Sequence, residues 1–320
     1  MNRIHWLSPG DPTQRTGGYL YNARMASALR EQGVDVIVHA LKGPWPWPQS
    51  SHQAQLQAVP NDAVVIADGL MWPGLNSSER AALCDRCQVW VVMHSLMDME
   101  DGSPGLADAE VSALRQANGW FATSERTARI LSGRLDGVTG SVVIPGTAPL
   151  VREDLPVSKR GKLLNVAHLI PRKNQKVLLQ ALATIRDLDW QLDIVGSQER
   201  DPDYASNVES YISQLGLYDR VQLRGELDEV ALEQAYSQAS CLIHTADFEA
   251  YGMVLTEALA RGLSVISTPA GALDALDSPR ITQVEHGDVE GLAQGIRSYL
   301  QSSEDQAASA PNFPTWTEQA

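Results

Sequence analysis

Two glutamates, Glu249 and Glu257, are the strongest candidates for chemistry in this sequence. Glu249 lies in a predicted loop, and Glu257 lies in a helix that the pattern predicts to begin at Gly252 and to stop at Gly262. Ionised carboxylates carry only hydrogen-bond acceptors, which suits them to the vicinal hydroxyls of a ribose or hexose. Taken in isolation, two acids near a helix start are more typical of a solvated helix end, where acidic residues are favoured.

The segment around these acids is predicted to form a strand, a loop and a helix that can bind an anion. Short apolar runs at 241–244 and 264–267 predict two buried parallel strands. The helix between them would direct the backbone N–H groups of Gly252, Met253 and Val254, and its positive dipole end, at the edge of the sheet. A diphosphate bound there would have one of the two glutamates on each side.

The whole stretch resembles the E-x7-E signature of retaining nucleotide-sugar glycosyltransferases, in particular glycosyltransferase family 4 (glycosyl transferases group 1). The resemblance extends through Gly252, Ala258, Gly262 and the run Val265-Ile266. It implies the GT-B fold, in which two Rossmann-like, doubly wound parallel-sheet α/β domains face a cleft. It also implies a hexosyltransferase that moves a sugar from a UDP or GDP donor to an acceptor hydroxyl with retention of configuration. In this family pattern, Glu249 holds the transferred sugar as a catalytic residue and Glu257 holds the ribose.

Two cations in the second half, Arg172 and Lys173, are predicted to neutralise the diphosphate. They follow the apolar strand at 163–167, at the edge of the sheet where ligands bind in such folds. Lys173 matches the family's lysine, whereas His168 stands where the family has an arginine, so Arg172 is expected to supply the missing charge. Gly271 is expected to line the donor pocket with its backbone.

In the first half, the resemblance implicates Gly17, Gly18 and His94. Gly17 and Gly18 precede a predicted helix, where glycine lets the backbone approach a phosphate or sugar closely. His94 directly follows an apolar strand and matches the family's catalytic-site histidine; on its own it is more typical of a histidine that hydrogen bonds the backbone. The family often has Asp next, but this chain has Ser95, so no family-type His-Asp pair is expected.

Apolar runs that alternate with helical periods predict a doubly wound α/β architecture along the whole chain. A Pro-rich segment without periodicity follows residue 144 and indicates a linker. We therefore predict an N-terminal acceptor domain at 1–150, a C-terminal nucleotide-sugar donor domain at 151–310, and at 311–320 the start of a segment that crosses back to the first domain.

The amino-acid composition and the net charge limit the classes of binding partner that this chain can have. The 320 residues are 43% hydrophobic and 20% charged, as in globular proteins with two domains. The net charge of −14 argues against nucleic acid, and its division into −3 for residues 1–150 and −11 for 151–320 gives no basic anchor for anionic lipid. No apolar run is long enough for a membrane span, and the first residues do not resemble a signal peptide. We predict a cytoplasmic protein that binds a nucleotide sugar and a small-molecule, glycan or lipid-linked acceptor, with peripheral membrane contact left open.

Neither a metal nor a cofactor is expected, apart from the nucleotide-sugar co-substrate. No Asp-x-Asp motif stands at a strand end, and no G-x-G-x-x-G follows a strand. Cys84 and Cys87 form a lone C-x-x-C without further ligands, which is typical of structural thiols.

Three questions stay open at this stage. A nucleotide-sugar epimerase on the same fold would need an added acid and base near the sugar. A catalytically idle GT-B binding module is the alternative outside enzymes, because Ser95 and His168 depart from the family pattern. Tryptophans at 45, 47 and 72 lie after predicted strands and suit either an acceptor surface or the edge of the core.

Overall fold

The computed structural model describes residues 3–10, 14–101, 104–148, 160–274, 276–302 and 311–320. The chain forms two compact units. Unit 1 comprises Met1–Ala148 with Pro314–Ala320, and unit 2 comprises Pro149–Phe313. The boundaries predicted at residues 150 and 310 lie outside the described residues. Within the described ranges, no helix is both long and apolar enough to cross a membrane.

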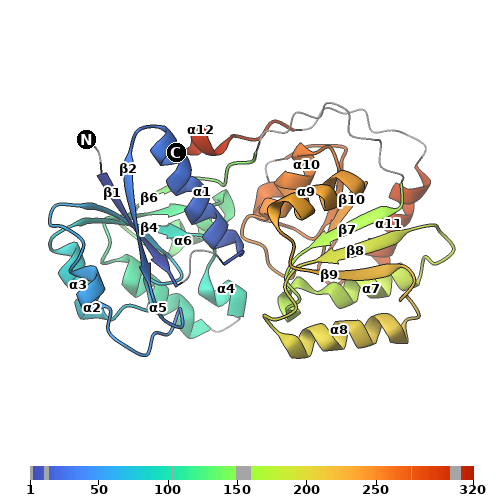
Figure 1. The fold of residues 1–320 in the computed structure, drawn as a ribbon, viewed down its shortest axis with the longest axis horizontal. Helices are drawn as coiled ribbons and strands as arrows, with labels where there is room; N and C mark the ends of the chain where they lie inside the picture. The colour runs from blue at the N-terminus through green and yellow to red at the C-terminus, as the bar shows by residue number, and fades with distance from the viewer. Residues whose placement is uncertain (1–2, 11–13, 102–103, 149–159, 275, 303–310) are drawn as a thin grey trace. The chain divides into compact units, whose positions relative to one another are not determined.

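Unit 1 is built on a six-stranded parallel sheet in the order β2-β1-β3-β4-β5-β6 (Figure 1). Its strands are β1 (Arg3–Pro9), β2 (Asp35–Leu41), β3 (Val64–Asp68), β4 (Gln88–Met93), β5 (Gly119–Ala122) and β6 (Thr139–Val142). Its helices are α1 (Gly17–Glu31), α2 (Gln53–Leu56), α3 (Ser77–Cys84), α4 (Met97–Asp101), α5 (Pro104–Leu114), α6 (Glu125–Arg134) and α12 (Trp316–Gln319).

Apolar side chains leave both faces of this sheet, because successive residues of a strand point to opposite sides. On β1, Trp6 packs in one cluster with Tyr21 and Met25 of α1. The next residue, Leu7, packs in a second cluster that includes side chains of α2, α3, α5 and α6. The continuous apolar runs of the sequence therefore become strands buried on both sides.

Unit 2 is built on a second six-stranded parallel sheet, in the order β12-β11-β10-β7-β8-β9. Its strands are β7 (Lys162–Val166), β8 (Gln191–Val195), β9 (Val221–Gly225), β10 (Cys241–His244), β11 (Ser264–Ser267) and β12 (Ile281–Gln283). Its helices are η1 (Pro171–Lys173), α7 (Gln175–Ala183), α8 (Pro202–Gln214), α9 (Glu229–Gln238), α10 (Met253–Ala260), η2 (Gly271–Leu273) and α11 (Val289–Gln301). The predicted class of two doubly wound parallel-sheet α/β units is confirmed.

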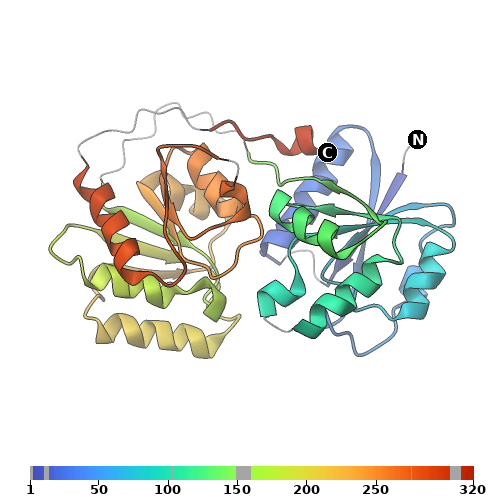
Figure 2. The ribbon, with the colours of Figure 1, turned by 180° about the vertical axis from the view of Figure 1, so that it is seen from behind.

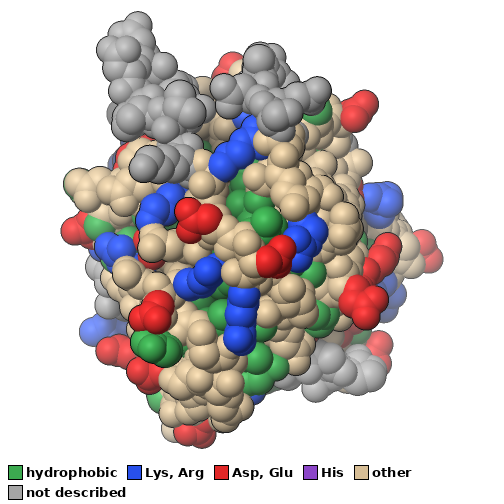
Figure 3. All heavy atoms as spheres, turned by 90° about the vertical axis from the view of Figure 1, so that its right-hand side faces the viewer, with side chains coloured by type: hydrophobic (Ala, Val, Ile, Leu, Met, Phe, Trp, Pro, Cys, Tyr) green, Lys and Arg blue, Asp and Glu red, His purple; other side chains and the backbone are tan. Residues whose placement is uncertain are grey.

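The two faces of this sheet are covered by different helices. Leu163 of β7 packs in a cluster with α7, α8 and α11, and α11 lies beside α7 (Figure 2). The next residue, Leu164, packs in a cluster with α9 and α10. Acidic and basic side chains are interspersed on the face of unit 2 that Figure 3 shows, without a large basic patch.

The strand orders locate the points where ligands bind in such sheets. In unit 1 the chain runs from β1 to β2 on one side and then starts β3 on the other side of β1. In unit 2 the chain runs from β7 through β9 and then starts β10 on the other side of β7. The loops that leave the carboxyl ends of the two central strands diverge at such a switch point and leave a crevice. The candidate site residues are therefore sought at the ends of β1, β3, β7 and β10.

The segment after residue 313 belongs to unit 1. Thr147 N–H donates to the carbonyl of Pro314 at 2.8 Å, and the Trp316 ring meets the edge of Tyr21 of α1 at a centroid distance of 5.6 Å. Gly146 leaves no room for a Cβ beside the backbone of Trp316. A short capped helix, α12, thus closes the face of unit 1 that α1 covers.

One buried acid makes the stability of unit 1 depend on pH. Glu110 of α5 is 1% exposed, and its Oε1 accepts from Met97 N–H at the start of α4 at 3.1 Å. Burial raises the pKa of Glu110 to about 7, against an ordinary value of 4.5. Between these two values the folded state holds the proton more tightly than the unfolded chain, so stability falls as pH rises through this window, by about 3 kcal/mol in total.

We expect Glu110→Gln to remove this slope and to stabilise unit 1 at pH 8, because Gln keeps the acceptor for Met97. Urea unfolding between pH 4.5 and 8 measures it. Glu79→Gln is the matched control: although burial opposes its charge, hydrogen bonds from Ser51 and backbone N–H groups lower the pKa of Glu79, so its contribution to stability is lost only at lower pH and the slope between pH 4.5 and 8 is expected to stay as in the wild type. Equal slopes in Glu110→Gln and the wild type would contradict the assignment.

Candidate functional site

The start of α10 depends on a glycine. Gly252, the residue before the helix, has φ +92°, and a Cβ there would lie 2.7 Å from Leu255 Cδ1 and 3.2 Å from Glu249 Cγ. Leu255 is fully buried, so it has little room to move. The first N–H groups of a helix have no partner inside it, and they include those of Met253 and Val254. Gly252 thus lets α10 begin directly beside Glu249, at the carboxyl end of β10.

Glu249 is held by a lysine and a histidine that contact the same oxygen. Lys173 Nζ lies 2.5 Å and His244 Nε2 lies 3.2 Å from Glu249 Oε2. The Glu249 side chain is 18% exposed, that of Lys173 12% and that of His244 2%. Burial opposes the charge of the carboxylate, but the adjacent lysine and the hydrogen bond from His244 hold the pKa of Glu249 well below its usual range. The site therefore contains an ionised carboxylate at neutral pH.

Lys173 reaches Glu249 because the loops after β7 and β10 are joined by hydrogen bonds. Asn174 adopts a left-handed conformation with φ +55°, and its Nδ2 donates to Asp247 Oδ1 at 2.8 Å. Thr245 Oγ1 donates to the carbonyl of Lys173 at 3.1 Å. The carbonyl of Arg172 accepts from Asp247 N–H at 2.8 Å, and Arg172 Nη1 donates to the carbonyl of Phe248 at 3.5 Å. Both predicted cations therefore lie beside the loop that carries Glu249.

Glu257 lies in the second turn of α10, where a buried tyrosine contacts it. Tyr236 of α9 is 1% exposed, and its hydroxyl donates to Glu257 Oε2 at 2.9 Å. The guanidinium of Arg261 lies 4.7 Å from the centre of the Tyr236 ring and pairs with Glu233. Helices α9 and α10 thus fix the orientation of this carboxylate.

Two other predicted positions of unit 2 have backbone roles. Gly271 N–H donates to the carbonyl of Glu249 at 3.3 Å, so this amide supports the Glu249 loop. His168, which replaces the family's arginine, accepts a hydrogen bond from Ser197 N–H on Nδ1 at 3.2 Å. His168 therefore ties the loop after β7 to the end of β8.

In unit 1, His94 has a carboxylate partner that the sequence did not reveal. His94 Nε2 lies 3.1 Å from Asp68 Oδ2 and 3.0 Å from Asn22 Oδ1. Asp68 is the last residue of β3 and is 2% exposed, and Leu70 N–H donates to its Oδ1 at 2.7 Å. Ser95 leaves His94 without the family-type Asp at the next position, but the neighbouring strand β3 provides a carboxylate partner that the sequence analysis did not foresee.

Gly18 makes room for this imidazole. A Cβ at Gly18 would lie 3.0 Å from His94 Cδ2, and the His94 ring meets the edge of Tyr21 at a centroid distance of 5.0 Å. A Cβ at Gly17 would meet nothing within 4 Å. Gly18 thus packs closely against His94, where a Cβ would need the imidazole to shift by a few tenths of an ångström, whereas Gly17 leaves space at the start of α1.

The three tryptophans that follow predicted strands differ in whether they belong to the core or to the surface. Trp72 is fully buried, and its Nε1 donates to the carbonyl of Ala113 at 2.9 Å, so it belongs to the core. Trp45 packs against the same core and donates to the carbonyl of Leu41 at 2.8 Å. Trp47 is 56% exposed, so its ring is accessible to a ligand such as an acceptor.

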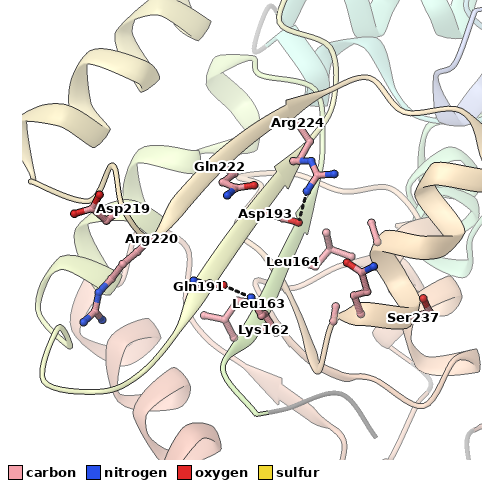
Figure 4. A pocket seen from close by; sticks show the side chains of 13 residues that line it. Lys162, Leu163, Leu164, Gln191, Asp193, Asp219, Arg220, Gln222, Arg224 and Ser237 are labelled. Atoms are coloured by element: carbon pink, nitrogen blue, oxygen red, sulfur yellow. Dashed lines mark hydrogen bonds and ion pairs between the residues drawn. The ribbon is translucent and has the colours of Figure 1, made fainter. Parts of the chain in front are cut away.

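A separate hollow of about 530 Å³ in unit 2 is lined by residues of β7, β8 and β9 and of α9, and Figure 4 shows the side chains that line it. It contains the first residues of β7 and β8, at the opposite end of these strands from Lys173 and Glu249. Its polar side chains contact one another: Arg224 Nη1 lies 3.2 Å from Asp193 Oδ2, and Lys162 donates to Gln191. The hollow therefore does not form part of the candidate site.

Metal ligands and reactive thiols are not grouped in the described part of the chain. No cluster of three or more His, Cys, Asp or Glu side chains there has the geometry to hold a metal. Cys84 and Cys87 are free thiols, and burial raises the pKa of Cys84 to about 11. Its thiolate is scarce at neutral pH, which suits a structural role.

Four residues with a place in these arrangements were missed by the sequence: Asn22, Asp68, Tyr236 and His244. Asp68 and His244 each end a strand next to the switch point of its sheet, and a polar residue at that position is the signal that could have found them. Asn22 and Tyr236 lie on helices, among apolar neighbours, where no local pattern distinguishes them.

Comparison with known proteins identifies a family. The family model described as "Glycosyl transferases group 1" matches residues 150–314. The GDP-Man:Man(3)GlcNAc(2)-PP-Dol alpha-1,2-mannosyltransferase of Dictyostelium discoideum is 26% identical over an alignment of 156 residues that covers 45% of this chain and 30% of that protein. The D-inositol 3-phosphate glycosyltransferase of Arthrobacter sp. (strain FB24) is 29% identical over 142 residues, 43% of this chain and 33% of that protein. The matched part spans about a third of each of these relatives.

Solved structures resemble the whole chain in fold. Sucrose-phosphate synthase from Thermosynechococcus elongatus has a TM-score of 0.76 at 19% identity, covering 100% of this chain and 92% of that one. Anabaena HepE in complex with UDP and glucose has a TM-score of 0.73 at 18% identity, covering 97% and 92%. At such identities the likeness supports the fold, which is that of the GT-B glycosyltransferases.

Proposed function

Because this chain belongs to the glycosyl transferases group 1 family, we propose that it transfers a hexosyl unit from a nucleotide sugar to an acceptor hydroxyl. The observation that carries this proposal is the start of α10: the helix begins beside Glu249, which Lys173 contacts, and carries Glu257 in its second turn. Cations and helix amides suit a diphosphate, and carboxylates suit the hydroxyls attached to it.

The diphosphate is assigned to Lys173, Arg172 and the amides of Gly252, Met253 and Val254. Negative charge grows on the diphosphate as its bond to the sugar breaks, and donors fixed before the reaction stabilise that charge. Lys173 has three N–H donors, one of which it donates to Glu249 Oε2, so its ammonium group can also donate to phosphate oxygens.

The sugars of the donor are assigned to the two glutamates. Glu257 accepts from the ribose hydroxyls and Glu249 from hydroxyls of the transferred sugar. Gly271 supports the backbone of Glu249. In unit 1, His94 is assigned to the reacting sugar, with Asp68 and Asn22 fixing its imidazole, and Gly17 and Gly18 are assigned to close backbone approach to the donor.

We propose retention of configuration and placement in glycosyltransferase family 4, on the strength of the E-x7-E pattern. The acceptor oxygen forms a bond to the anomeric carbon on the face from which the diphosphate leaves, the carbon–diphosphate bond breaks, and the acceptor proton passes to the leaving phosphate oxygen. No protein nucleophile or cofactor takes part in this scheme.

The names of the relatives support a proposal for the classes of donor and acceptor. The Dictyostelium protein is named for GDP-mannose and a dolichol-linked acceptor, and the Arthrobacter protein for an inositol phosphate. HepE was crystallised with UDP and glucose. We propose a UDP or GDP donor and a small-molecule, glycan or lipid-linked acceptor, used in the cytoplasm with or without peripheral membrane contact.

The test begins with thermal shift of the whole chain against UDP, GDP, UDP-glucose, UDP-N-acetylglucosamine and GDP-mannose, since a ligand that binds the folded state raises its melting temperature. The donor that shifts it is then incubated with candidate acceptors, and NMR reads the anomeric configuration of the product. Binding without any transfer or hydrolysis would favour an idle module. Conversion of the donor sugar into its epimer would favour the epimerase.

Turnover is expected to persist in EDTA, because Lys173 and Arg172 supply the positive charge that a divalent ion would otherwise provide. Rates are measured with excess EDTA and again after addition of magnesium or manganese. Loss of turnover in EDTA that either ion restores would contradict this mechanism.

A further inference from the structure

We propose that His244 is the positioning residue of Glu249, and that it keeps this carboxylate aimed at the transferred sugar while Lys173 binds the diphosphate. This inference rests on the proposed function and adds a residue to which neither the sequence pattern nor the comparisons assign a role.

His244 is placed rigidly. It is the last residue of β10, which pairs with β7 on one side and β11 on the other, at the switch point of the sheet of unit 2. All four residues of β10 are buried, and the imidazole is 2% exposed. A side chain fixed in this way has little rotamer freedom left to lose when a ligand binds.

The hydrogen bond between His244 and Glu249 has one direction. Burial lowers the pKa of His244, although Glu249 opposes this effect, so the imidazole is neutral at pH 7 and has a single N–H. Glu249 is ionised and only accepts, so the N–H is on Nε2 and donates to Oε2 at 3.2 Å. His244 Nδ1 has no hydrogen-bond partner within the described residues.

Both donors use the same oxygen of Glu249, which leaves the other one for a ligand. Lys173 and His244 contact Oε2, and across the described ranges Oε1 has no hydrogen-bond donor. A carboxylate oxygen accepts about two hydrogen bonds. Oε1 can therefore accept from vicinal hydroxyls of a sugar without any rearrangement of the contacts at Oε2.

Lys173 and His244 are not equivalent holders of this carboxylate. The ammonium group of Lys173 lies at the end of a flexible side chain, and a bound diphosphate would compete with Glu249 for it. The imidazole of His244 is buried, and within the described residues its hydrogen-bond partner is Glu249. When Lys173 turns toward the diphosphate, His244 is the contact that preserves the orientation of Glu249.

The experiment compares two substitutions at this position. His244→Leu removes the donor at similar size, whereas His244→Gln retains an N–H donor. We expect His244→Leu to lower kcat about 10- to 100-fold, as for partners that orient other site ligands, and to leave the Kd for UDP or GDP within about threefold. We expect His244→Gln to recover most of that kcat.

His52→Leu is the matched control for loss of a buried histidine. His52 in unit 1 is 3% exposed, and its Nε2 hydrogen bonds to the carbonyl of Lys42 at 2.7 Å. We expect its kcat to stay near the wild-type value. Wild-type kcat in His244→Leu, equal loss of diphosphate binding and kcat in that variant, or no recovery in His244→Gln would overturn the inference.

A second readout covers the case in which His244→Leu does not fold. ¹⁵N NMR of the wild-type imidazole is expected to show the neutral Nε2–H tautomer, and Glu249→Gln is expected to shift that nitrogen. A neutral Nδ1–H form would overturn the inference. A wild-type protein that binds no nucleoside diphosphate and turns over no nucleotide sugar would overturn the proposed function as well.

Discussion

Replacing Glu249 with alanine is expected to lower kcat about 100-fold while leaving the Kd for a nucleoside diphosphate within about threefold of wild type. The sugar that Glu249 holds changes charge and shape in the transition state, whereas the diphosphate alone never meets Oε1. The substitution also releases Lys173 from its 2.5 Å contact, so UDP or GDP is expected to bind as well as before or slightly more tightly.

Glu257→Ala is the matched comparison, because Glu249 precedes α10, Glu257 lies in its second turn, and each is held at Oε2 by a buried donor. The ribose does not change during the reaction, so this variant is expected to raise KM and to weaken UDP or GDP as much as the nucleotide sugar. Calorimetry with the diphosphate is set beside turnover for both variants. If Glu249→Ala abolished diphosphate binding and Glu257→Ala spared it, the two assignments would be reversed.

Gly196→Ala is expected to destabilise unit 2 by about 4 kcal/mol, among the largest effects of a single substitution. Gly196 follows the last residue of β8 and has φ +154°, and a Cβ there would collide with the carbonyl of Ala167 and lie 2.8 Å from the nitrogen of His168. Both obstacles are backbone, held by the bond from Ala167 N–H to the Val195 carbonyl at 2.9 Å. No side-chain rotation relieves such a contact.

Gly216→Ala is the control that separates the two effects of Gly196→Ala, because Gly216 has a positive φ but no atom with which a Cβ would collide. Gly216 follows α8 at φ +62°, in a helix-ending turn where Leu217 N–H bonds to the Ile212 carbonyl at 3.0 Å, and a Cβ there meets nothing within 4 Å. It is expected to cost about 1 kcal/mol. Hydrogen exchange locates the loss in unit 2 and urea unfolding measures it. Similar costs for both variants would show that the close approach at Gly196 is easily relaxed.

The sequence predicted those parts of the site that lie close together along the chain. Glu249, Gly252 and Glu257 share one strand, loop and helix, so their spacing alone indicates where they lie. Lys173 is distant in sequence, but it follows β7 at the switch point, where the edge of a parallel sheet brings it to Glu249. The contact between Lys173 and Glu249 could therefore be predicted from the sheet topology together with the family resemblance.

The site contacts that depend on which strands and helices are neighbours in the fold could not be predicted from the sequence. Only Ser95 was visible beside His94, and nothing local shows that β3 lies next to β4 and brings Asp68 within 3.1 Å. His244 looked like one more member of an apolar strand, since burial, rather than residue type, makes it a fixed neutral donor. Trp72 was left undecided because the partner of its indole, the carbonyl of Ala113, lies on a helix far along the chain.

The assignment of residues 314–320 to unit 1 has a consequence for biosynthesis. A ribosome completes unit 2, an uninterrupted stretch of chain, before it adds α12 to unit 1. Until then the groove beside Tyr21 lacks Trp316, and Thr147 N–H lacks the Pro314 carbonyl. Unit 1, which is translated first, is therefore completed only after unit 2, and a nascent chain that lacks residues 314–320 exposes apolar surface of α1 that these residues cover.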